Sequence, residues 1–185
     1  MWHWQRLRHG GVAVLGACVL AACGGSGGDD DGDGGTPLPP NGGGTVLTAG
    51  VAGLVGDWLE NGCVTTGGQS FRRVLRATQL TPTSIAYSEG VATYGNGRCE
   101  GVRTVVGPSR MGDVVFSRSE SNVRVAANWG EFTTITNTRF AVIWAKKSEI
   151  NLCLLGDQNP SILPTLDAVE ASLKTLPDLG CFTRQ

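Results

Sequence analysis

The chain of 185 residues lacks histidine beyond its first ten positions, where His3 and His9 lie. A serine–histidine–acid triad, a cysteine–histidine dyad and a histidine metal site all need an imidazole, so the chain after His9 excludes all three. An excess of one charge is lacking too, since 15 Lys and Arg face 16 Asp and Glu, for a formal net charge of −1. That balance gives no reason to expect nucleic acid as a partner.

A long hydrophobic run is also missing from the amino-terminal region. The weakly apolar stretch from Gly11 to Ala22 is shorter than the about 20 residues that a transmembrane helix needs. It follows a short basic segment with Arg6 and Arg8 and immediately precedes Cys23. This order is typical of an export signal rather than of a folded element.

The end of this stretch, Leu20-Ala21-Ala22-Cys23, resembles the lipobox of bacterial lipoproteins. The resemblance implies that residues 1–22 are a signal peptide and that Cys23 carries a diacylglyceryl thioether and an amide-linked acyl chain such as palmitate. Two or more chains anchor a protein stably to a membrane. Gly24 replaces the aspartate that retains such proteins in the inner membrane, which implies the outer membrane of a Gram-negative envelope, on its periplasmic or surface face.

Residues 23–46 follow as the lipidated cysteine and a segment dominated by Gly, Asp and Pro. Such a composition buries too little apolar surface to offset the entropy of ordering the chain. We therefore expect a disordered tether between the anchor and the folded part.

The folded part is expected over residues 47–185, where short runs rich in Val, Ile, Thr, Phe and Trp alternate with turn residues. The expected fold is mainly β: a small antiparallel barrel-like domain of about eight strands with one carboxyl-terminal helix. The strands are expected at 57–63, 71–78, 84–94, 99–106, 113–119, 123–129, 132–136 with 139–145, and 149–155, with turns at 95–97, 107–108 and 128–130.

The carboxyl-terminal helix is predicted to begin after Thr165, which can cap it, and to end before Pro177. Asp167 falls in its first turn, where the helix dipole favours an acid. Its apolar stripe, which we expect against the barrel or in its mouth, consists of Leu166, Val169, Leu173 and Leu176.

Four cysteines remain once Cys18 is assigned to the signal and Cys23 to the lipid. An even number in an exported chain predicts two disulfides. Three pairings are open, and we favour Cys63 with Cys99 and Cys153 with Cys181, because each joins neighbours in chain order. The close spacing of a four-thiolate zinc site is missing, so we expect neither a metal nor a cofactor.

Candidate ligand-binding residues come from the strand patterns. Arg73 shares the apolar phase of Phe71 and Leu75, and an inward arginine could bind a carboxylate or phosphate head group, although a pairing with a local acid is the plainer alternative. Tyr87, Trp129 and Trp144 could line a cavity or belong to the core. The acids are scattered, so no two-carboxylate site is evident, while a pair brought together by folding stays open.

Gly56-Asp57-Trp58 is similar to the Gly-x-Trp motif that begins the first strand of lipocalins and related calycin barrels. The resemblance implies a tryptophan that closes one end of the barrel and a cavity for small hydrophobic molecules. The Thr-Asp-Tyr turn motif of that family is absent, and the domain is short for it.

These observations predict a non-catalytic lipoprotein anchored in the envelope membrane. The first hypothesis is a barrel that binds a small hydrophobic or amphipathic ligand. The alternative is a module that binds an envelope protein, such as a hydrolase inhibitor. A filled barrel interior would argue against the first, and an exposed apolar patch would support the second.

Overall fold

The computed structural model describes residues 44–155 and 161–185. The signal peptide, Cys23 and most of the expected tether lie outside the described residues. The elements are α1 (Val51–Leu54), β1 (Gly56–Glu60), β2 (Val64–Thr66), β3 (Gln69–Thr81), β4 (Ser84–Tyr94), β5 (Arg103–Ser121), β6 (Ala126–Thr134), β7 (Arg139–Ser148), β8 (Asn151–Leu154), α2 (Leu166–Thr175), the 3₁₀ turn η1 (Asp178–Gly180) and β9 (Cys181–Arg184).

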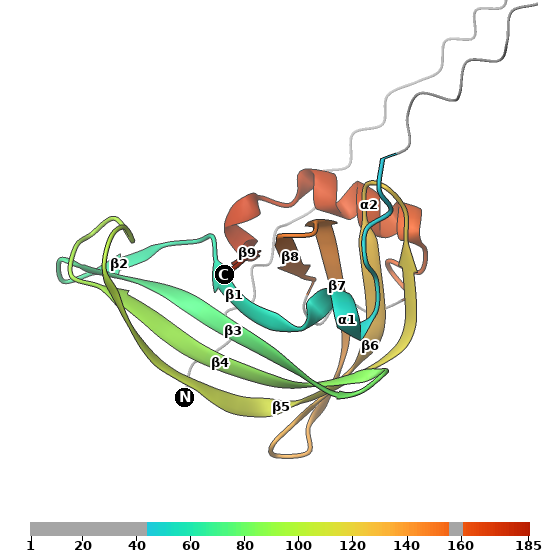
Figure 1. Ribbon diagram of the computed structural model, residues 1–185, viewed down its shortest axis with the longest axis horizontal. Coiled ribbons are helices and arrows are strands. Elements are labelled where there is room, and N and C mark those ends of the chain that lie inside the picture. The colour runs from blue at the N-terminus through green and yellow to red at the C-terminus, as the bar shows by residue number, and fades with distance from the viewer. Residues whose placement is uncertain (1–43, 156–160) are drawn as a thin grey trace, which may run out of the picture. The chain divides into compact units, whose positions relative to one another are not determined.

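One antiparallel sheet contains all the strands, in the order β1-β9-β8-β7-β6-β5-β4-β3-β2 (Figure 1). Because β1 also pairs with β3, eight strands close into a barrel and β2 is added outside the closure. The predicted mainly β barrel is therefore confirmed. None of the helices in the described ranges is long and apolar enough to cross a membrane.

Several strand boundaries differ from the prediction. The expected strands at 99–106 and 113–119 form one strand, β5, because at Gly107 and Pro108 the chain makes a local irregularity in its pairing with β4, with a φ of 86° at Gly107, instead of turning back. Likewise β6 continues through Gly130, where a turn was expected. The short strands β2 and β9 were not expected. The three residues of β2 form a hairpin with the start of β3 across Gly67 and Gly68, a two-residue turn that the prediction overlooked, whereas β9 becomes a strand only through partners distant in sequence.

Side chains fill the barrel interior. The fully buried members of the interior cluster are Trp58, Phe182, Leu54, Leu75, Ile85, Leu152 and Val114. Trp144 packs edge to face against both Tyr87 and Phe116, with ring centroids 5.5 and 5.9 Å apart. Such aromatic pairs add about 0.5–1.5 kcal/mol each beyond the area that they bury.

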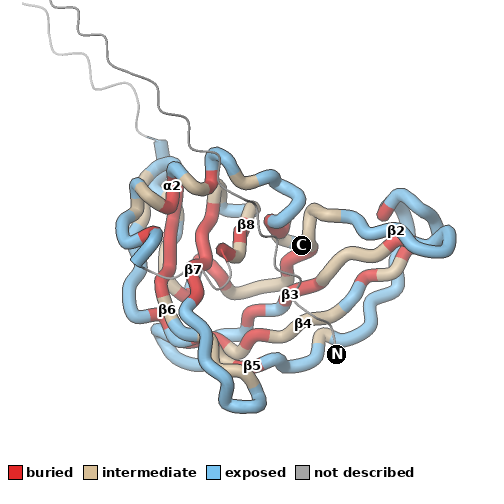
Figure 2. The backbone as a smooth tube through the Cα atoms, turned by 180° about the vertical axis from the view of Figure 1, so that it is seen from behind, coloured by how far each residue is buried: buried red, intermediate tan, exposed pale blue. Residues whose placement is uncertain are grey.

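Helix α2 covers the outside of the barrel. Thr165 caps it by accepting a hydrogen bond from the Ala168 amide (3.2 Å), as predicted. Its buried residues Val169 and Leu173 belong to a second apolar cluster with residues of β6 to β9. The stripe therefore packs against the barrel wall rather than in the mouth. In Figure 2, long buried stretches of β6 and β7 lie beside α2.

The short helix α1 closes one end of the barrel. Asn128 is fully buried and accepts a hydrogen bond from the Gly50 amide at 2.6 Å. Lys146, also fully buried, donates to Glu149 Oε2 at 2.6 Å, while Glu149 Oε1 accepts from the Thr48 amide at 2.6 Å. These bonds attach the segment before α1 to β6 and to the end of β7. They also give the buried polar side chains of Asn128 and Lys146 hydrogen-bond partners.

The ion pair beside α1 predicts a dependence of stability on acid. Hydrogen bonds from Lys146 and from Thr48 lower the pKa of Glu149 to about 2, from an ordinary value of 4.5. A carboxyl whose pKa is lowered by folding stabilises the folded state above its unfolded pKa, and this contribution is lost as pH falls toward the folded pKa. We therefore expect part of the folding stability to be lost between about pH 4.5 and pH 2.

Replacing Glu149 by glutamine tests this expectation. At pH 7 the free energy of unfolding, measured with urea, should fall by about 1 kcal/mol, because the carboxylate is half exposed and screened by water. Between pH 4.5 and 2 the difference from wild type should shrink. Equal stability losses at pH 7 and pH 2.5 would contradict the assignment. Glu131→Gln, in an exposed pair with Arg139, is the matched control.

Candidate functional site at the open end of the barrel

A sheet extension, which we call the wing, projects from the barrel end away from α1 (Figure 1). It consists of β2, residues 69–73 of β3, residues 90–94 of β4 and residues 103–107 of β5. It arises because β1 pairs with β3 only as far as Leu59 and Val74, so the three long strands continue without β1. Figure 2 shows that the outer part of the wing around β2 is largely exposed.

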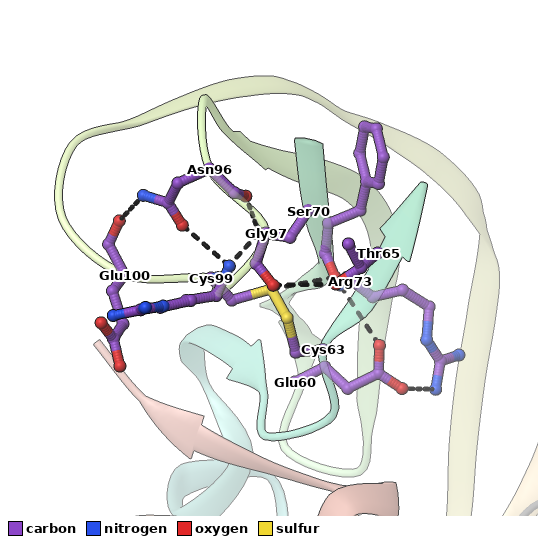
Figure 3. Close-up of a disulfide and its surroundings, with 11 residues drawn as sticks. Glu60, Cys63, Thr65, Ser70, Arg73, Asn96, Gly97, Cys99 and Glu100 are labelled. Atoms are coloured by element: carbon purple, nitrogen blue, oxygen red, sulfur yellow. Dashed lines mark hydrogen bonds and ion pairs between the residues drawn. A yellow bond between two sulfur atoms is a disulfide. The ribbon is translucent and has the colours of Figure 1, made fainter. Parts of the chain in front are cut away.

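The disulfide Cys63–Cys99 ties the connection between β1 and β2 to the loop that joins β4 to β5 (Figure 3). Ser70 is fully buried beneath them, donates to the Asn96 carbonyl at 2.6 Å and accepts from the Cys99 amide at 2.7 Å. The wing is therefore a braced frame. With Cys153–Cys181, which links β8 to β9, both predicted pairings are confirmed.

Arg73 lies where the barrel interior passes into the wing. On β3 it shares a side with Leu75, which is part of the interior cluster, because side chains alternate along a strand. Its guanidinium lies 5.2 Å from the centre of the Phe182 ring. It donates to Glu60 Oε1 at 2.7 Å (Figure 3) and lies 3.6 Å from Glu89 Oε1.

This geometry changes the chemistry expected of Arg73. The arginine does face inward, but it is paired with two acids of the chain itself. Burial alone would lower the pKa of Arg73, yet the hydrogen bond from Arg73 to Glu60 and the charges of Glu60 and Glu89 outweigh it and raise that pKa. The two carboxylates flank the guanidinium in one ion-pair network, so they do not form a bare acid pair.

Tyr87 joins this network and connects it to the core. Its hydroxyl donates a short hydrogen bond to Glu89 Oε1, and its ring contacts Trp144 and Phe132. Burial, assisted by the negative charge of Glu89, raises the pKa of Tyr87, so the phenol stays neutral. Three of the four predicted ligand residues, Arg73, Tyr87 and Trp144, are thus brought together on the inner side of the barrel.

Trp129 does not share this site. It belongs to the cluster under α2, where its indole donates to the Leu163 carbonyl at 2.8 Å and the Arg118 guanidinium lies 3.8 Å from its ring centre. Two surface depressions of about 230 and 330 Å³ border Arg118. The larger is lined by Gly50 and Val51, at the end closed by α1, so neither depression belongs to the open end.

The inner side of the wing carries exposed apolar residues. Val91 lies opposite both Arg73 and Val106, and one rung outward Val64 lies in the row of Phe71. The exposed fractions are 40% for Val91, 69% for Val106 and 65% for Val64, and Val102 just before β5 is 94% exposed. An apolar row on a braced strand frame has no role in the fold itself.

One edge of the wing is also unpaired. Residues 103–110 of β5 pair with β4 only, since contacts on the other side begin at Met111, whose carbonyl accepts from the Ile135 amide, and β6 pairs with β5 from Gly112 onward. Pro108 and the irregular register near it restrict strand addition there. Residues 103–107 therefore present free backbone groups beside the exposed valines.

Sequence reasoning missed the partners that define the site, Glu60 and Glu89. A signal was present, because Glu60 shares the strand phase of Trp58, and Glu89 that of Tyr87. The ion pairs were nevertheless missed, because Arg73, Glu60 and Glu89 lie on three different strands, and no local pattern reveals the register between those strands. The described residues contain no group of three or more His, Cys, Asp or Glu that could hold a metal ion.

Comparison with protein-family models, curated proteins and solved structures found no match to this chain.

Proposed function

We propose that the chain is a non-catalytic envelope lipoprotein, anchored through Cys23, that binds another envelope protein with its wing. The observation that carries the proposal is the row of exposed valines on the inner side of a sheet extension braced by Cys63–Cys99. An exposed apolar surface lowers solubility and therefore marks an interaction site. A rigid surface loses little conformational entropy when a partner binds to it.

The anchor is part of the same proposal. The lipobox resemblance of Leu20-Ala21-Ala22-Cys23 supports lipidation, and two disulfides fit an oxidising compartment such as the periplasm or the cell surface. The Gly56-Asp57-Trp58 resemblance to calycin barrels also fits, because Trp58 lies buried at the end that α1 closes.

Binding of a small amphipathic ligand is the second candidate. The convergence of Arg73, Tyr87 and Trp144 on the inner side favours it, whereas the filled interior leaves such a ligand only the mouth. A ligand of this kind would be retained in native mass spectrometry of protein released gently from membranes.

A photo-crosslinking amino acid at position 106 tests partner binding in intact cells. We expect a discrete covalent adduct with one protein, because Val106 projects from the wing next to Val91. The matched control is position 115, also a valine of β5 and 52% exposed, but within the closed barrel. Adducts of equal yield at both positions, or none at 106, would count against the wing as the binding surface.

Two variants complete the test. Val91→Asp should remove the adduct at position 106 while leaving the thermal unfolding temperature almost unchanged, because Val91 is already exposed. Cys23→Ala should abolish incorporation of labelled fatty acid and move the protein from the membrane to the soluble fraction. Retention of label in that variant would refute the anchor.

A further inference from the structure

The ion-pair network at the open end carries a net negative charge. Two carboxylates, Glu60 and Glu89, face one guanidinium, Arg73, and one neutral phenol, Tyr87. The same three charged groups are the ones whose fields act on the Tyr87 hydroxyl. An unpaired inward arginine would attract an anion. Here the two carboxylates outnumber the one guanidinium, so the network attracts a cation instead.

The network is reachable from solvent and is not saturated. The side chains of Glu60, Glu89 and Arg73 are 16%, 24% and 41% exposed. Glu89 Oε1 accepts from Tyr87 and faces Arg73, but no described residue donates a hydrogen bond to Glu89 Oε2. A carboxylate can accept several hydrogen bonds, so this oxygen can take a further donor.

The surroundings would strengthen such a bond. Val91 lies directly across from Arg73, Val106 lies across from Val91, and both valines are exposed. A strand laid over these valines would displace water from the carboxylate, and charges interact more strongly as the effective dielectric constant falls.

We propose that the wing receives an extended segment of the partner protein that places a lysine or arginine side chain on Glu89 and small apolar side chains on Val91 and Val106. This deepens the partner binding proposed above and depends on it. The cation would donate a charge-assisted hydrogen bond to Glu89 Oε2. The free edge of β5 at residues 103–107 lies beside this surface and suits an extended segment.

Three short peptides test the charge that the site prefers. The probes are the blocked peptides Val-Thr-Lys-Thr-Val, Val-Thr-Glu-Thr-Val and Val-Thr-norleucine-Thr-Val, in which the central side chain and both valines lie on one side of an extended segment. Each is titrated into the full lipid-anchored chain in detergent with labelled valine methyl groups. We expect the lysine peptide to shift the Val91 and Val106 signals and to bind at least about fivefold more tightly than the other two.

Glu89→Gln should reduce the preference for lysine over norleucine to about one, because it removes the charge but keeps the shape. Glu131→Gln, on the barrel, should leave the preference intact. Tighter binding of the glutamate peptide, no binding of any peptide, or a lysine preference that survives Glu89→Gln would overturn the inference.

Failure of this inference is distinguishable from failure of the proposed function. If position 106 crosslinks a partner while the peptides show no charge preference, the partner uses the apolar surface alone. If position 106 gives no adduct, the proposed function itself fails.

Discussion

Replacing Trp58 by alanine should lower the free energy of unfolding by about 3–5 kcal/mol, the largest effect expected of any single substitution in this protein. Trp58 is fully buried, and its indole donates to the Leu54 carbonyl at 2.8 Å. The Arg184 guanidinium lies 4.7 Å from its ring centre. Alanine would leave a cavity and an unpaired carbonyl where α1 closes the barrel.

Urea unfolding followed by far-ultraviolet circular dichroism measures this effect. Phe140→Ala is the control, because Phe140 is also aromatic and on a barrel strand but is 42% exposed, so it should cost about 1 kcal/mol or less. Trp58→Phe should fall between the two, since it keeps most of the volume and loses the hydrogen bond. Similar losses for Trp58→Ala and Phe140→Ala would show that this end of the barrel is not closed by Trp58.

Replacing Cys153 and Cys181 together by alanine should cost about 3–4 kcal/mol by the loop-entropy argument. The bridge spans 28 residues of sequence and joins β8 to β9, and both cysteines are fully buried under α2. Because β9 also pairs with β1, losing the bridge loosens a strand that helps to close the barrel. Hydrogen exchange should therefore quicken in β1, β8 and β9.

The other disulfide provides the contrast. Cys63→Ala with Cys99→Ala removes a bridge of similar span, but one that joins the residue before β2, a strand with every residue exposed, to the loop between β4 and β5. Its loss should quicken exchange in residues 64–73 and 91–106 and leave β6 to β8 protected, because the wing can open without the barrel. Exchange that quickens equally everywhere would contradict the separation of wing and barrel.

Local patterns predicted the elements whose causes are local. Thr165, Asp167 and the stripe around Val169 determined α2, since capping and a 3.6-residue period act within a few turns. Chain-order proximity sufficed for the two disulfides. Val125, Ala127 and Trp129 alternate with other residues in the sequence and all belong to the cluster under α2, but alternation by itself indicates only that one side of a strand is buried.

Which side of the sheet each aromatic residue occupies was beyond such patterns. Trp129 and Trp144 both read as buried strand residues, yet one lies under α2 and the other inside the barrel. A barrel wall covered by a helix has apolar residues on both sides, so alternation cannot tell the inside from the outside. The continuation of β5 through Gly107 and Pro108 was missed because turn residues also occur at irregular positions within long edge strands.

The sequence by itself determined the fold class and the helix with its cap, because each follows from composition or from neighbours within a few residues. It only favoured the cysteine pairing, among three, and the apolar phase of Arg73. Only the tertiary structure decided that β1 leaves β3 at Leu59, that Glu60 and Glu89 meet Arg73, and that valines of three strands form one exposed surface. Strand register sets all three, and register is established by the closing of the whole barrel.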